Sequence, residues 1–63
     1  MGARLKRLFD FAQETGGEQT VMRLTMKTGI SEDNAASTAD DDDTISQVSD
    51  AIAAITGDTP PSV

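Results

Sequence analysis

The chain has 63 residues, five of them basic and eleven acidic, so its formal net charge at neutral pH is -6. A chain of this length forms one small domain, which buries only about 60 % of the surface that the unfolded chain exposes. The sequence contains no cysteine and no histidine, which excludes disulfide frameworks, zinc fingers, thiol nucleophiles and Ser-His-Asp catalysis.

The charges are distributed unevenly along the chain. All five basic residues lie within the first 27 positions, whereas the chain from Ser31 onward carries eight acidic residues and no basic residue. This asymmetry permits an electrostatic contact between the two halves, within one chain or between two chains. We expect the acidic half to form a soluble surface that repels other anions, including nucleic acid.

The sequence contains no segment typical of a membrane or secreted protein. No apolar run approaches the roughly 18 to 20 residues that cross a bilayer, and the N-terminal residues lack the uninterrupted apolar core of a signal peptide. We therefore expect a cytoplasmic protein that has no membrane partner.

The clearest predicted element is a helix over residues 3–15, which Gly16 and Gly17 end. Its apolar side chains recur with the i, i+3, i+4, i+7 spacing of an amphipathic helix: Leu5, Leu8, Phe9 and Ala12. Phe11 lies about 60° beyond Leu8 around the helix axis. The apolar face is therefore broad enough to contact two neighbours.

Residues 18–28 fit two patterns. Their helical stripe consists of Val21, Leu24, Thr25 and Thr28. The same residues also alternate in the manner of a strand and are rich in β-branched side chains. We favour a helix, because the sequence has no second strong alternating segment with which a strand could pair.

A tight turn follows the second predicted helix. Gly29 is a natural C-terminal cap for that helix. Ser31 is suited to be the N-cap of a short third element, because acidic residues in the first turn of a helix interact favourably with its dipole. This short element is predicted to end by Ser37 or Thr38.

The last predicted helix extends over residues 45–56 and follows an acidic flexible loop over residues 36–43. The loop is predicted from its four consecutive aspartates and from its lack of apolar periodicity. Thr44 is the predicted N-cap, since Gln47 three residues later completes a capping box. The apolar stripe of the helix consists of Ile45, Val48, Ile52 and Ile55. Residues 58–63 are predicted to form a disordered tail.

These elements predict an all-α fold, a small three-helix bundle with one additional short helical turn, in a single domain over residues 1–57. Large apolar side chains are few, and the chain has no disulfide to stabilise it. A domain of this size often depends on well-packed helices or on a partner chain. We therefore expect a protein partner or self-association, for example as a dimer.

The segment 21–40 has the outline of a helix-turn-helix, a DNA-binding motif. Three positions match the usual pattern of small and apolar residues: Leu24, Gly29 and Ile30. Thr25 and Thr38 depart from it, and the second element offers Glu32 and Asp33, which phosphates would repel. We therefore interpret the segment as a structural turn, and keep a degenerate helix-turn-helix DNA-binding or regulatory protein as an alternative.

The aspartate run does not have the spacing of a calcium-binding loop. An EF-hand requires glycine at its sixth position, whereas a loop that starts at Asp40 or Asp41 has Ile45 or Ser46 there. We expect no metal site and no cofactor. Mimicry of nucleic acid, in which clustered carboxylates replace phosphates, remains a second alternative.

We do not expect an enzyme, because the chain offers no activated nucleophile, no phosphate-binding loop and too little structure to bury a catalytic carboxylate. No small-molecule substrate is evident. The predicted function is a non-catalytic protein-interaction or accessory domain. Basic residues beside apolar ones on the first helix suit an acidic groove or a membrane surface, so an amphipathic surface binder is a further alternative. Methionines fill gaps in helical cores at least as often as they line adaptable binding surfaces. The predicted partner surface consists of Arg4, Lys6, Arg7, Phe11, Met22 and Met26.

Overall fold

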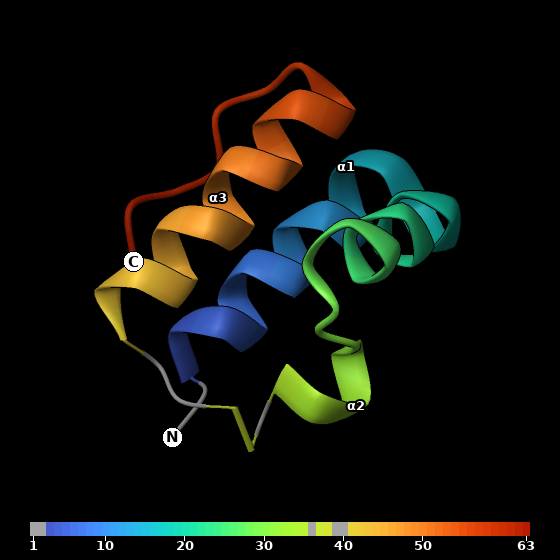
Figure 1. Cartoon of the computed structure of the whole chain (residues 1–63). Helices are drawn as coiled ribbons and strands as arrows, with labels where there is room; N and C mark the ends of the chain where they lie inside the picture. Colours follow the sequence, from blue (N-terminus) through green and yellow to red (C-terminus); the bar gives the residue numbers. More distant parts are fainter. Residues whose placement is uncertain (1–2, 36, 39–40) are drawn as a thin grey trace.

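The structure is a computed structural model that describes residues 3–35, 37–38 and 41–63. Its elements are α1 (Ala3–Thr28), α2 (Glu32–Ala35) and α3 (Asp42–Thr56), as Figure 1 shows. The described residues contain no strand. The predicted all-α fold is therefore confirmed.

α1 consists of two helical halves that meet at Gly17. The φ of 73° and ψ of -166° at this residue are not helical, and only glycine, which has no Cβ, adopts such a backbone conformation readily. The two helices predicted over residues 3–15 and 18–28 both exist, but they join directly through the kink. The second half of α1 consequently turns away from the axis of the first half (Figure 1).

The hydrophobic core lies where the two halves of α1 meet α3. The largest fully buried side chains are Phe9, Leu5, Leu8, Leu24, Ile52 and Val48. The first half of α1 and α3 provide most of them, while Val21 and Leu24 of the second half of α1 and the small Ala35 of α2 also belong to the cluster. The predicted apolar stripes therefore converge on one core.

The turn between α1 and α2 is built as the sequence predicts. Gly29 has a φ of 78°, and its N–H donates a hydrogen bond to the carbonyl of Thr25 at 2.7 Å. Ser31 Oγ then accepts a hydrogen bond from the N–H of Asn34 at 3.2 Å. Gly29 therefore ends one helix and Ser31 caps the next, and α2 is a single turn of four residues.

α3 begins earlier than the sequence predicts, and its cap is a different residue. The helix starts at Asp42 and not at Ile45, and Asp41, not Thr44, is the N-cap. The Asp41 carboxylate accepts a hydrogen bond from the N–H of Thr44, with Oδ1 and N 2.8 Å apart. The capping-box prediction was wrong because an aspartate can cap equally well, and Asp42 and Asp43 then occupy the first turn, where the helix dipole stabilises negative charge.

The predicted acidic loop over residues 36–43 is therefore shorter than expected. Asp42 and Asp43 belong to α3, while residues 36, 39 and 40 lie outside the described part of the chain. Ser37 and Thr38 form a turn, in which both backbone N–H groups donate hydrogen bonds to the carbonyl of Asn34.

The C-terminal segment follows the helix in an extended path. Gly57 closes α3 in a left-handed conformation, and its N–H donates to the carbonyl of Ala53. The chain then runs back along α3 (Figure 1), and Val63 packs partly buried against the core. Pro60 restricts the backbone of this segment and Val63 provides an apolar contact, while the disorder expected for residues 58–63 stays a prediction.

Candidate functional site

The structure separates the six residues of the predicted partner surface into two groups. Arg4, Lys6, Arg7 and Phe11 lie on the first half of α1, whereas Met22 and Met26 lie on the second half. The kink at Gly17 lies between the two groups along α1. Lys6 and the two methionines border different hollows, which share Glu32 and Asp33 in their lining.

Two of the basic residues in the first group already have acidic neighbours within the chain. Nη1 of Arg4 lies 3.3 Å from Oδ1 of Asp42, and Nζ of Lys6 lies 3.5 Å from Oδ2 of Asp10. Both are surface ion pairs, whose contribution to stability is typically small. They nevertheless reduce the positive charge that this face presents to an acidic partner.

Phe11 is half-buried and packs against the core. It borders a shallow hollow of about 220 Å³ between α1 and the C-terminal segment. The residues that line this hollow are Arg7, Asp10, Phe11, Glu14, Pro61 and Val63. The protein's own tail thus covers part of the apolar surface that the sequence assigned to a partner.

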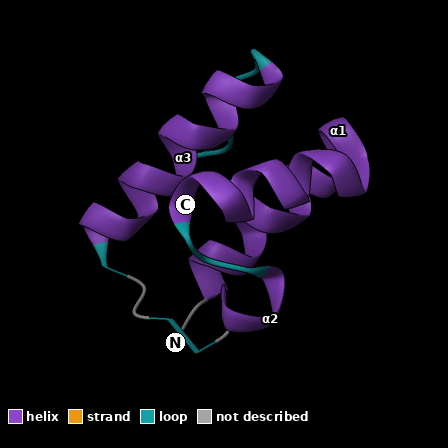
Figure 2. Cartoon of the chain, turned by 45° about the vertical axis from the view of Figure 1, so that its right-hand side comes forward, coloured by secondary structure: helices purple, strands orange, loops and turns teal. Residues whose placement is uncertain are grey.

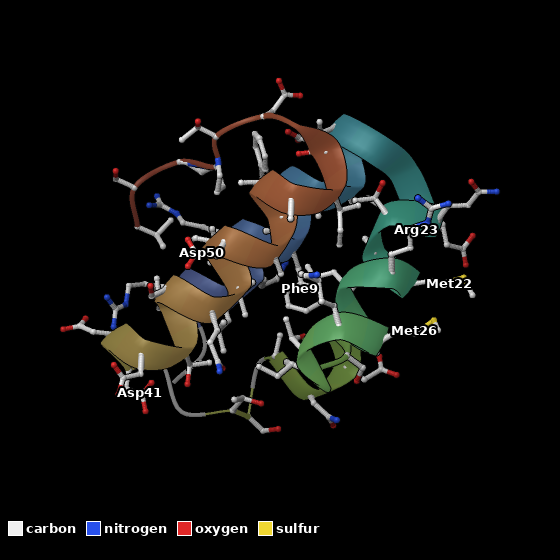
Figure 3. The ribbon with its side chains drawn as sticks, turned by 45° about the horizontal axis from the view of Figure 1, so that its top comes forward. Phe9, Met22, Arg23, Met26, Asp41 and Asp50 are labelled. Atoms are coloured by element: carbon white, nitrogen blue, oxygen red, sulfur yellow. The ribbon has the colours of Figure 1, made fainter. Side chains whose placement is uncertain are left out.

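Met22 and Met26 are the large apolar side chains that remain exposed among the described residues. The two residues are 58 % and 83 % exposed. They lie one helical turn apart, a spacing that places two side chains next to each other on a helix surface. Figure 3 shows both projecting from the same side of α1 into solvent, whereas Phe9 lies in the interior.

A hollow of about 370 Å³ adjoins the two methionines, between the second half of α1 and the start of α2. It exists because the turn at Gly29 and Ser31 brings the start of α2 back beside α1, as Figure 2 shows. The lining residues are Glu18, Val21, Met22, Thr25, Met26, Ser31, Glu32 and Asp33. We call Met22, Met26 and this hollow the methionine surface.

The border of the methionine surface is negatively charged. Glu18, Glu32 and Asp33 are all exposed, and none of them forms an ion pair within the part of the chain that the structure describes. Glu32 and Asp33 also border a neighbouring hollow of about 340 Å³ beside Lys6. The methionine surface therefore has an apolar centre and an acidic border. We call Glu18, Glu32 and Asp33 the acidic rim.

Sequence reasoning found the methionines of this surface but missed its acidic rim. The spacing of Glu18 and Met22 by four residues could have placed them together on a helix face. Glu32 and Asp33 could not be found in this way, because only the turn at Gly29 brings them beside α1.

The segment that has the outline of a helix-turn-helix contains a very short second helix. α2 consists of Glu32, Asp33, Asn34 and Ala35, so it is only about 6 Å long at 1.5 Å per residue. Its first turn carries the two acidic residues. The described residues thus form the turn of the motif at Gly29 and Ser31. They do not form a long basic recognition helix after it.

Metal-ligand clusters and unpaired buried polar atoms are both absent from the described ranges 3–35, 37–38 and 41–63. These ranges contain no group of three or more acidic side chains that could hold a metal ion. Their buried side-chain nitrogen and oxygen atoms all have hydrogen-bond partners. In the same ranges, no helix has the length and apolar character required to cross a bilayer.

Comparison of the chain with protein-family models, with curated proteins and with solved structures found no match.

Proposed function

We propose that this protein is a non-catalytic interaction domain that binds a partner protein through the methionine surface. The observation that carries this proposal is the exposure of Met22 and Met26 beside a hollow. Exposed apolar side chains that cluster together are typical of protein-protein contact sites. Methionine suits such a site, because its flexible thioether adapts to partner side chains of different shape.

The fold itself does not require these two side chains in their observed positions. The core is filled by other residues of α1 and α3, so Met22 and Met26 contribute little to it. Burial of one such side chain in an interface would gain roughly 1.5 to 3 kcal/mol relative to exposure. A partner that covers both methionines could therefore obtain much of its binding free energy from them.

The described geometry gives less support to the other functions that the sequence leaves open. A DNA-binding role would depend on α2, which has four residues and an acidic first turn. A role in binding membrane surfaces would depend on the apolar face of the first half of α1, yet Leu5, Leu8 and Phe9 are buried in the core. Neither role uses the exposed methionines.

A site-specific photo-cross-linker placed at Met26 tests the proposal in the native host. The matched control carries the same cross-linker at Gln13, which is also exposed on α1 but does not line the methionine surface. We expect a discrete cross-linked protein from position 26 only. That protein is then identified, purified and titrated against the unmodified chain.

The titration is repeated with the double variant Met22→Gln/Met26→Gln. We expect its affinity for the purified partner to fall by roughly tenfold or more, which corresponds to the loss of about 1.4 kcal/mol. Equal cross-linking from positions 13 and 26, or an unchanged affinity of the double variant, would refute the proposal.

A further inference from the structure

We infer that the methionine surface binds a cationic amphipathic segment, whose apolar side chain contacts Met22 and Met26 while its Lys or Arg residues face the acidic rim. This inference rests on the proposed function and specifies the chemistry of the partner. It is carried by the combination of two features at one place: exposed apolar side chains and three carboxylates beside them.

The acidic rim selects a positively charged partner. Glu18, Glu32 and Asp33 border the same hollow as the methionines and are not engaged in ion pairs with described residues. Opposite charges at the rim of an interface accelerate association and exclude partners of the wrong sign. The net charge of -6 adds a long-range attraction for cationic segments.

A second copy of the chain is a poor occupant for the same electrostatic reason. In a twofold symmetric dimer each surface patch faces the same patch of the other copy. Contact through the methionine surface would therefore bring Glu18, Glu32 and Asp33 of one copy close to the same carboxylates of the other. Anionic lipid surfaces and nucleic acid would meet the same repulsion.

The charges beside the methionines also give the bound segment an orientation. Arg23 follows Met22 and Lys27 follows Met26 in α1, but neither lines the hollow, and Figure 3 shows Arg23 near Met22. The positive side chains of the segment therefore point toward Glu18 and α2, and not toward Arg23. A segment with its basic residues on one edge of an apolar stripe satisfies this arrangement.

Three synthetic peptides of about 14 residues, long enough for some four helical turns, test the inference with the full-length protein. They share one stripe of leucines and differ only at the flanking positions, which are Lys, Gln or Glu. Binding is measured by fluorescence anisotropy at about 50 mM and about 500 mM salt. We expect the Lys peptide to bind roughly tenfold more tightly than the Gln peptide at low salt, and the Glu peptide not to bind.

Two charge variants locate the binding site. Glu18→Gln/Glu32→Gln/Asp33→Asn removes the rim, and Glu14→Gln/Asp50→Asn/Asp58→Asn removes the same number of exposed carboxylates elsewhere. We expect the rim variant to lose most of the preference for the Lys peptide and the control variant to retain it. Circular dichroism verifies that both variants are helical, and the comparison of the three peptides on the wild-type protein is independent of folding changes.

The outcomes distinguish this inference from the proposed function. If the Lys and Gln peptides bind equally well, the inference that the partner is cationic is wrong. If this binding is also lost in Met22→Gln/Met26→Gln, the result still supports the methionine surface as an interaction surface. Failure of the Lys peptide to bind would also overturn the inference, while the cross-linking experiment would decide the proposed function separately. An equal loss of binding in the two charge variants would reveal non-specific attraction and refute the inference.

Discussion

Arg4 in the first turn of α1 and Asp42 in the first turn of α3 form an ion pair across 38 positions of the sequence, with Nη1 and Oδ1 3.3 Å apart. The pair joins the basic N-terminal region to the acidic C-terminal half within one chain. It forms because α3 runs beside the first half of α1 in the same direction (Figure 1). The electrostatic contact that the charge asymmetry of the sequence permits is therefore formed within one chain.

The first prediction concerns the strength of this ion pair. The Asp42 side chain is 96 % exposed, so solvent screens the pair and its expected contribution is roughly 0.2 to 1 kcal/mol. Asp43→Asn is the matched control, because it removes a carboxylate from the same helical turn but no ion pair with a described residue. In urea unfolding, Asp42→Asn should be less stable than Asp43→Asn at low salt, and the difference should vanish at high salt. Equal stability of the two variants at low salt would contradict the prediction.

The second prediction concerns the pH dependence that the Asp41 cap introduces. The side-chain hydrogen bond and the backbone hydrogen bond from Thr44 lower the pKa of Asp41 below its ordinary value of 3.8. Since the folded state has the lower pKa, the cap stabilises the protein fully above the unfolded-state value, and its contribution is lost as the pH falls through the folded-state value.

The variant Asp41→Asn separates capping from titration, because asparagine caps a helix about as well but carries no ionisable group. Thermal unfolding measured by circular dichroism between about pH 6 and about pH 3 should show a smaller decrease in Tm for Asp41→Asn than for the wild type. Asp41→Ala should have a lower Tm than either protein near neutral pH. Parallel pH profiles for wild type and Asp41→Asn would show that the cap does not titrate as expected.

The third prediction contrasts the core with the methionine surface. Leu8 and Ile52 are completely buried, so Leu8→Ala and Ile52→Ala should each cost about 2 to 4 kcal/mol. Ile52→Val removes one methylene group and should cost about 0.5 to 1.5 kcal/mol, which keeps the measurement possible if the larger truncations unfold so small a domain. Met26→Ala should change the unfolding free energy by no more than about 0.5 kcal/mol. A large loss of stability in Met26→Ala would mean that this side chain serves the fold and not a partner.

The fourth prediction concerns the kink at Gly17. Gly17 and Gly57 both have positive φ, and both face open space where a Cβ would lie. Gly57 has a left-handed conformation with ψ near 2°, which asparagine tolerates. The ψ of -166° at Gly17 belongs to a region that is essentially restricted to glycine.

Gly17→Asn should therefore lower the unfolding free energy by about 1 to 3 kcal/mol, and Gly57→Asn should lower it by less. Chemical denaturation followed by circular dichroism compares the two variants directly. If both substitutions lower the unfolding free energy equally, the conformation at position 17 does not require glycine more strongly than the conformation at position 57.

The helical class of the fold and most of its core follow from local sequence patterns. Leu5, Leu8 and Phe9 repeat at helical spacing, and this local periodicity is sufficient to assign them to one buried face. Gly29 and Ser31 could be assigned as a helix end and a helix start, because capping depends on a few adjacent residues. The N-cap of α3 was missed because Asp41 and Thr44 are both suitable caps, and local chemistry does not choose between them.

The way in which these elements meet could not be predicted from local patterns. The pairing of Arg4 with Asp42 and the placement of Val63 against the core depend on the relative positions of distant segments. The methionine surface depends on tertiary structure too, because Glu32 and Asp33 lie beside Met22 only after the chain has reversed at Gly29. Periodicity identifies which residues share a helix face, but the neighbours of that face are set by the packing of the whole chain.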